Sequence, residues 1–167
     1  MVIHDFAEKK RQGKKGESFL DRYFSLWYKV EPVSLDEERA HGYDRIFKGL
    51  YPAFEYLAKA PVEQMRVEYK TDYLAAKTGN VFIETISVST AGKKGWIYTS
   101  HADLLVYFIP PIFRIYCCPM KDVRKVFLSD WQSRYVAKIV SNGDYATHGI
   151  LVPVSVFAKT AKRTIQL

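Results

Sequence analysis

The sequence has very few of the residues that build disulfide frameworks and zinc sites. Its only cysteines are Cys117 and Cys118, and adjacent cysteines rarely pair with each other because the geometry is strained. The four histidines are scattered and show no HExxH spacing, so a zinc hydrolase has little support. We predict that the two cysteines serve as small apolar residues on a strand.

Long hydrophobic runs and several common catalytic motifs are also missing. The longest apolar run, residues 104–109, ends at Pro110 and is much shorter than the roughly 20 residues of a membrane-spanning helix. The N-terminal residues are charged and lack the apolar core of a signal peptide. Without GxSxG, Walker A or GxGxxG motifs, acyl hydrolases, P-loop NTPases and dinucleotide enzymes are unsupported. We expect a soluble, intracellular protein.

What the sequence does contain is an apolar pattern that alternates between helix and strand periods. With 167 residues and 48% hydrophobic residues, the chain fits a single domain with a real core. The spacing of apolar residues predicts helices over 16–30 and within 120–140. It predicts extended segments over 44–47, 65–69, 81–88, 102–109, 112–118 and 150–157, with Pro153 placing the last of these at a sheet edge. We therefore predict one α/β domain with a mixed sheet.

Positive charge is in excess, with a net charge of +7, which favours polyanionic partners. Cationic residues are concentrated near the N-terminus at Lys9, Lys10, Arg11, Lys14 and Lys15. We predict that residues 1–15 form a basic arm that contacts phosphates, or a solvated leader, ahead of a domain spanning 16–167. Lys77 and the pair Lys93 and Lys94 lie in predicted turns and are further candidates for nucleic-acid contact.

The candidate chemistry centres on Glu68 and Lys70 in the predicted strand 65–69. Side chains alternate along a strand, so these two project from the same face. A carboxylate in that position can bind a hard divalent cation such as Mg²⁺, and the amine can orient an attacking water or stabilise charge on a phosphoryl oxygen. Taken alone, the same spacing is also typical of an ordinary ion pair on a strand.

The order of the acidic residues along the chain adds a family resemblance. Glu17 lies in the first predicted helix, Asp44 on the next strand candidate, and the sequence Glu68-Tyr69-Lys70 follows. This order resembles the PD-(D/E)XK nuclease superfamily, which includes archaeal Holliday junction resolvases, restriction endonucleases and phage-type nucleases. The segments VEYKTD (67–72), TGNVFIE (78–84) and GWIYTSHAD (95–103) are similar to a phage or viral branch of that superfamily.

The resemblance implies a fold, an activity and a set of site residues. The fold would be a restriction-endonuclease-like mixed β-sheet flanked by helices. The activity would be that of a Mg²⁺- or Mn²⁺-dependent DNA endonuclease, acting on branched or otherwise structured DNA among other substrates. Asp44 and Glu68 would bind the metal, Lys70 would be the catalytic lysine, and Glu17 would assist through a metal-bound water. A homodimer, and the cytoplasm of a host cell for a viral protein, are also implied.

Several alternatives remain open at this point. Asp44 and Glu68 are far apart for a compact hairpin, so either residues 49–61 are an insertion or the second metal ligand is Glu55 or Glu63. Glu17 also suits the first turn of an ordinary helix. Glu84 is predicted either to neighbour the site or to pair with Lys77, and Trp96 is expected in the core. The competing functions are a non-catalytic nucleic-acid-binding protein and a viral interaction protein, and the pattern does not separate DNA from RNA.

Overall fold

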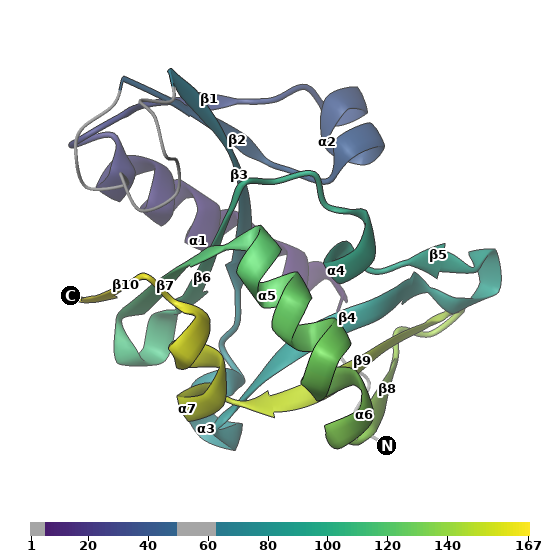
Figure 1. Cartoon of the computed structure of the whole chain (residues 1–167). Helices are drawn as coiled ribbons and strands as arrows, with labels where there is room; N and C mark the ends of the chain where they lie inside the picture. The colour runs from purple at the N-terminus through teal and green to yellow at the C-terminus, as the bar shows by residue number, and fades with distance from the viewer. Residues whose placement is uncertain (1–5, 50–62) are drawn as a thin grey trace.

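A six-stranded mixed sheet runs through the computed structural model, which describes residues 6–49 and 63–167 apart from the side chains of residues 6, 7 and 9. Strands β3 and β6 are parallel, and every other neighbouring pair is antiparallel. The strand order is β1 (Lys29–Pro32), β2 (Arg45–Lys48), β3 (Gln64–Thr71), β6 (Leu104–Ile109), β7 (Arg114–Pro119) and β10 (Arg163–Gln166). The predicted mixed α/β architecture is therefore confirmed (Figure 1).

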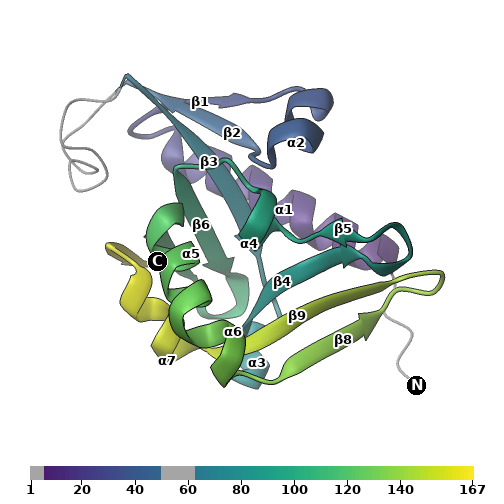
Figure 2. The same cartoon turned by 45° about the vertical axis from the view of Figure 1, so that its right-hand side comes forward.

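A second sheet, entirely antiparallel, projects from the first (Figure 2). Its strand order is β5 (Lys93–Lys94), β4 (Asn80–Val88), β9 (Ala146–Pro153) and β8 (Ala137–Ser141). The sequence predicted one sheet, but the chain turns away after β3. Asp72 Oδ1 accepts hydrogen bonds from the amides of Leu74 and Ala75, which starts helix α3 (Ala75–Thr78) and redirects β4 into the second sheet.

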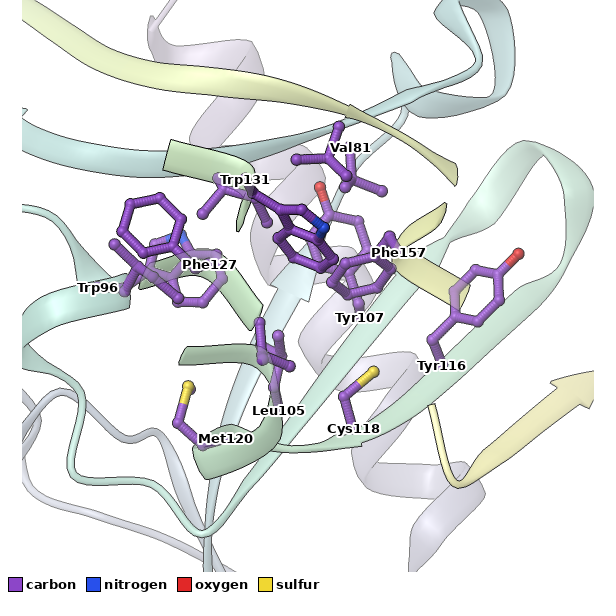
Figure 3. Close-up of a cluster of buried hydrophobic side chains, with 14 of the residues drawn as sticks. Val81, Trp96, Leu105, Tyr107, Tyr116, Cys118, Met120, Phe127, Trp131 and Phe157 are labelled. Atoms are coloured by element: carbon purple, nitrogen blue, oxygen red, sulfur yellow. The ribbon is translucent and has the colours of Figure 1, made fainter. Parts of the chain in front are cut away.

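The two faces of the six-stranded sheet are covered by different elements. Helix α1 (Phe6–Phe24) covers one face through Leu20 and Phe24. The opposite face is covered by the second sheet and by a group of helices (Figures 1 and 3). That group is α5 (Met120–Val126), the π-helical turn Phe127–Trp131, α6 (Gln132–Arg134) and α7 (Val154–Phe157).

Strand β6 shows why a near-continuous apolar run was needed here. All of its residues are buried, because alternate side chains enter the two cores. Leu104 and Val106 pack in the cluster under α1, whereas Leu105 and Tyr107 pack in the cluster with Trp131. Figure 3 shows this second cluster, where the rings of Tyr107, Trp131 and Phe157 lie together.

Strand β7 confirms the prediction made for the cysteines. It forms an antiparallel hairpin with β6, and both thiols are free and buried. Cys117 belongs to the core under α1, and Cys118 belongs to the core on the other face. Burial raises the pKa of both thiols, to about 12 for Cys118, so they remain protonated apolar packing residues.

Helix α1 differs from its prediction at both ends. It begins at Phe6, ten residues before the predicted start at 16, so residues 6–15 of the expected arm are helical. This stretch is rich in Ala, Glu, Lys, Arg and Gln, which are good helix formers, and Arg11 pairs with Glu8 one turn away. The helix ends at Phe24, and strand β1, which the sequence did not predict, follows.

The C-terminal part also requires corrections. The predicted extended segment 150–157 is divided between β9, which ends at Pro153, and the short helix α7. Pro153 is not at a sheet edge, because β9 lies between β4 and β8. A proline is tolerated there because it is the last residue of the strand, where the chain leaves the ladder for α7. Strand β10, which extends the first sheet, was also not predicted.

Candidate functional site

The candidate site is built on strand β3, whose odd-numbered residues face α1. Met65, Val67 and Tyr69 belong to the core under that helix. Glu68 and Lys70 therefore project from the opposite face, as the strand period predicts. The Glu68 side chain is only 5% exposed and that of Lys70 is 34% exposed, with Oε1 and Nζ 2.5 Å apart. The pair is thus a buried carboxylate whose lysine partner still reaches solvent.

Asp44 joins this pair through the pairing of β2 with β3. The antiparallel register places Arg45 opposite Val67, and the amide of Asp44 donates a 2.9 Å hydrogen bond to the Val67 carbonyl. Its carboxylate oxygen Oδ2 accepts a 2.6 Å hydrogen bond from the amide of Tyr69. The Asp44 side chain thus accepts a hydrogen bond from β3 just beyond the first paired residue of β2. It lies beside Tyr69, the residue between Glu68 and Lys70.

The same register bears on the candidates for the second carboxylate, Asp44 and Glu63. β2 and β3 are neighbours although residues 49–63 lie between them, so this stretch is an insertion in a hairpin and Asp44 keeps its place. Glu63 is exposed and precedes β3 at the end remote from Lys70, more than 15 Å along the strand by the usual rise per residue. Glu55 lies outside the described residues.

Burial and neighbouring charges shift both members of the pair. Burial raises the pKa of Glu68 to about 7, and the Asp44 carboxylate adds to the rise while Lys70 opposes it. For Lys70, burial lowers the pKa, but the carboxylates of Glu68, Asp44 and Glu84 outweigh it, so that its pKa lies above the ordinary value. Lys70 is therefore a cation at neutral pH, held among three carboxylates.

Glu17 lies close to this group but has its own partner. It is in the middle of α1 rather than in the first turn, so the helix dipole does not account for it. Its Oε2 accepts a 3.2 Å hydrogen bond from Arg45, which is also bound to Asp21. Burial and then the Asp44 charge raise the pKa of Glu17, which indicates that the two carboxylates are near each other.

A close approach of α1 to β3 brings Glu17 into this region. A side chain at Gly16 would have its Cβ only 2.1 Å from the Thr71 hydroxyl oxygen, so only glycine fits at this contact. Thr71 directly follows Lys70, and Glu17 directly follows Gly16. The glycine thus sets the position of Glu17 relative to the end of β3.

Two neighbours of the site were not identified from the sequence. Glu38, on helix α2 (Leu35–His41), raises the pKa of both Glu68 and Glu17. Trp96, at the start of helix α4 (Trp96–Thr99), is buried as predicted, and its ring also lies 5.9 Å from Lys70 Nζ. The sequence does contain a signal for α2, because a serine precedes the helix and a glycine follows it. Ser34 accepts a hydrogen bond from the Glu37 amide, and Gly42 ends the helix.

Glu84 and the other basic candidates are distributed differently. Glu84, on β4, is close enough to raise the pKa of Lys70, and within the described residues it forms no ion pair with Lys77. Lys77 is exposed on α3, and Lys93 and Lys94 are exposed on β5. Lys10, Arg11, Lys14 and Lys15 share helix α1, whereas the side chain of Lys9 lies outside the described residues. The structure therefore groups four of the basic candidates on α1 and places the other three lysines on α3 and β5.

The carboxylates fit a hard cation only in part. Among the described residues, no three His, Cys, Asp or Glu side chains are arranged to hold a metal ion. Asp44 and Glu68 nevertheless offer hard oxygen ligands, and their contacts with Tyr69 and Lys70 each use one carboxylate oxygen. Mg²⁺ is commonly bound by one or two carboxylates, with waters and substrate phosphates as the other ligands. The donor set fits an ion whose coordination a phosphate substrate completes.

Comparisons with known proteins add no family to this description. No family model, curated protein or solved structure matches the chain. Within residues 6–49 and 63–167, no helix has both the length and the apolar character needed to cross a membrane.

Proposed function

We propose that this chain is a divalent-metal-dependent nuclease whose active site comprises Asp44, Glu68 and Lys70. The observation that carries the proposal is the hydrogen bond from the Tyr69 amide to Asp44, because it brings a second carboxylate to the buried Glu68–Lys70 pair. An isolated surface ion pair would not need a third charged group or a nearly buried carboxylate.

The arrangement of elements also supports the finer fold assignment. In the PD-(D/E)XK pattern, an acidic residue of the first helix precedes one on a hairpin strand and then a (D/E)-x-K strand. Here Glu17 is on α1, Asp44 immediately precedes β2, and Glu68 and Lys70 are on β3, which pairs with β2. We therefore infer a restriction-endonuclease-like fold with the second sheet as an addition.

The proposed mechanism assigns one task to each residue. Asp44 and Glu68 would hold Mg²⁺ or Mn²⁺, which when bound supplies an activated water and neutralises charge on the phosphodiester. Lys70, protonated among its carboxylates, would donate hydrogen bonds to the phosphoryl oxygen or to the attacking water. Glu17, engaged with Arg45, would hold α1 against β2 rather than act on the substrate.

The direct test is cleavage by the purified protein of duplex, single-stranded, flap and four-way DNA, and of the matching RNA. We expect cleavage of at least one substrate with Mg²⁺ or Mn²⁺ and none with EDTA. Cleavage that is insensitive to EDTA, or absent from every substrate with either metal, would reject the proposal.

A second candidate function is a non-catalytic nucleic-acid-binding protein on the same fold. It is favoured by the strongly basic helix α1, whose cations can bind phosphates without any metal ion. This alternative predicts salt-sensitive binding to nucleic acid without cleavage in either metal.

A further inference from the structure

An open groove of about 950 Å³ lies between helix α1 and the turn that joins β6 to β7. The turn is the 3₁₀ helix Pro110–Ile112 followed by Phe113. The groove is on the α1 side of the sheet, whereas Glu68 and Lys70 project from the other side. It is a feature that the proposed active site does not use.

One wall of this groove is strongly cationic. Its charged lining residues are Lys10, Arg11, Lys14, Lys15 and Arg22, all on α1 and all exposed. Arg11 is paired with Glu8. Among the described residues that line the groove, none carries a carboxylate. Such a wall is complementary to a row of phosphates, and the helical spacing of the cations spreads the charge along the groove.

The other wall and the floor are aromatic. Phe19 and Phe108 stack with their ring centroids 5.0 Å apart and their planes 11° from parallel, and Tyr73 is also a lining residue. Phe113 on the turn is 56% exposed, although its large apolar ring would gain from burial. An exposed aromatic ring facing a cationic wall is the combination that binds an unpaired nucleotide by its phosphate and its base.

The backbone of Phe113 gives an independent reason to assign it a role. Its φ of 48° is in the left-handed region, where a bulky side chain is rare and costs free energy. The C-terminal strand holds it there, since the Leu167 amide donates a 3.0 Å hydrogen bond to the Phe113 carbonyl and Gln166 donates one to Ile112. The backbone that presents this exposed ring to the groove is thus held in place by the C-terminal strand.

The groove reaches the end of β3 that carries Lys70. Gly16 lines the groove and contacts Thr71, the residue after Lys70, and Tyr73 lines it two residues farther on. A strand bound at the proposed active site would have to pass around this end of the sheet to enter the groove.

We propose that this groove binds a single-stranded segment of nucleic acid, with its phosphates along α1 and an unpaired base stacked on Phe113. The proposal rests on the nuclease function, because it identifies the part of the substrate that continues beyond the cut phosphodiester. It predicts a preference for nucleic acid with a single-stranded region, such as a flap or an overhang, over continuous duplex.

The test measures binding in EDTA, so that cleavage plays no part in it. A fluorescently labelled single strand of about 12 nucleotides is titrated with protein, and its anisotropy is followed at several salt concentrations. We expect Phe113→Gly to weaken binding about 10-fold and Phe113→Tyr, which keeps an aromatic face, to restore it to within about 2-fold. The melting temperature of Phe113→Gly should not fall, since glycine accepts the positive φ, so weaker binding cannot be attributed to unfolding.

Two charge variants with the same change in net charge complete the test. Lys14→Gln/Lys15→Gln should reduce the dependence of log Kd on log salt by about 1.4, the value for two phosphate contacts on a single strand. Lys121→Gln/Lys125→Gln, both exposed on α5 and on the opposite face of the sheet, should leave that dependence nearly unchanged. Equal effects of the two double variants, or wild-type affinity in Phe113→Gly, would overturn the groove.

Further measurements test whether duplex nucleic acid or a lipid surface occupies the groove instead, and distinguish failure of the groove proposal from failure of the nuclease proposal. Duplex bound as tightly as single strand, or anionic vesicles bound in place of nucleic acid and released by the α1 variant, would also overturn the groove proposal. Glu68→Ala should bind as the wild type does while losing cleavage. Binding that depends on the groove, without any cleavage, would support the groove proposal and reject the nuclease proposal. Normal cleavage with no effect of Phe113→Gly on binding would support the nuclease proposal and reject the groove proposal.

Discussion

Two carboxylate–lysine clusters on the same sheet have the same residue spacing, but the pKa of the glutamate is shifted in opposite directions in the two. In the first, Glu31 on β1 contacts Lys29, two residues away, at 2.7 Å and Lys48 on β2 at 2.6 Å. In the second, Glu68 on β3 contacts Lys70, also two residues away, at 2.5 Å. Hydrogen bonds from Lys29 and Lys48 lower the pKa of Glu31 to about 2, whereas burial raises the pKa of Glu68 to about 7.

The difference follows from what surrounds each carboxylate. Glu31 is near the sheet edge with two cations, so water and lysine both stabilise its charge. Glu68 is nearly buried, has one lysine, and has Asp44 beside it. A carboxylate in the second setting has excess negative charge nearby, which a proton or a bound cation would offset. The Glu31 cluster is therefore an internal control for the proposed site.

The largest expected effect is on catalysis. We expect Lys70→Ala and Glu68→Ala each to reduce metal-dependent cleavage about 100- to 1,000-fold, because each removes a charge aimed at the reacting phosphate. The matched variants Lys29→Ala and Glu31→Ala should stay within about 2-fold of the wild type, since an exposed pair adds little. Initial cleavage rates check this. Full activity in both β3 variants would show that the clusters do not differ in function.

The second expected effect is on metal affinity. Asp44→Asn keeps an oxygen that accepts the Tyr69 amide but removes the charge, so Mn²⁺ binding should weaken at least about 10-fold. Glu31→Gln should leave Mn²⁺ binding unchanged, because two lysines already balance that carboxylate. Electron paramagnetic resonance of free Mn²⁺ during a titration measures both. Equal affinities in the wild type and Asp44→Asn would exclude Asp44 as a ligand.

The third effect is on stability as a function of pH, and its sign should differ between the clusters. The pKa of Glu68 is raised from 4.5 to about 7, so the wild type loses stability as pH rises through this window. Glu68→Gln should therefore gain roughly 1 to 3 kcal/mol relative to the wild type between pH 4.5 and 7.

The matching variant at the other cluster should behave in the opposite way. The lowered pKa of Glu31 stabilises the fold above its ordinary value of 4.5, and this stabilisation is lost as pH falls towards about 2. Glu31→Gln should therefore be less stable than the wild type at neutral pH, with the difference shrinking in acid. Urea unfolding of the wild type and both variants, from neutral pH down towards about 2, measures how the stability difference of each variant changes with pH. Differences that change with pH in the same direction for both variants would contradict the contrast between the clusters.

The smallest effect concerns how tightly α1 covers the end of β3, which has no counterpart at β1. Gly16→Ala would clash with Thr71, at a cost of about 1 to 3 kcal/mol that a helix-propensity gain of about 1 kcal/mol partly offsets. Gly13→Ala, in the same helix with nothing within 4 Å, should instead stabilise the fold by about 1 kcal/mol. Thermal unfolding distinguishes the two, and stabilisation by both would show that the contact is loose.

The sequence predicted those strands whose apolar residues follow a regular local pattern. Strands β3, β4, β6 and β7 were predicted because their apolar residues alternate or run continuously. The division into two sheets was not predicted, because it depends on the Asp72 turn and on β9 returning to pair with β4. The short strands β1 and β10 were missed because four residues carry too little periodicity to stand out from a loop.

The candidate site shows the same division. Glu68, Lys70 and Asp44 were named from order and spacing, and the structure brings these three together. Glu38 was missed because only the fold of the chain brings its charge within reach of Glu68. The basic residues 10–15 were predicted as an arm because a run of lysines is also typical of disorder, and only the structure places them on a helix beside an aromatic turn.

The sequence by itself determined that Glu68 and Lys70 share a face, because the two-residue period of a strand is a property of local covalent geometry. It did not predict that Lys29 and Glu31, which have the same spacing, also lie on a strand, or how the surroundings of the two pairs differ. The tertiary structure decided that difference by burying Glu68 and bringing Asp44 to it across a long insertion. Desolvation and neighbouring charge set the pKa of a carboxylate, and both come from residues far away in the chain.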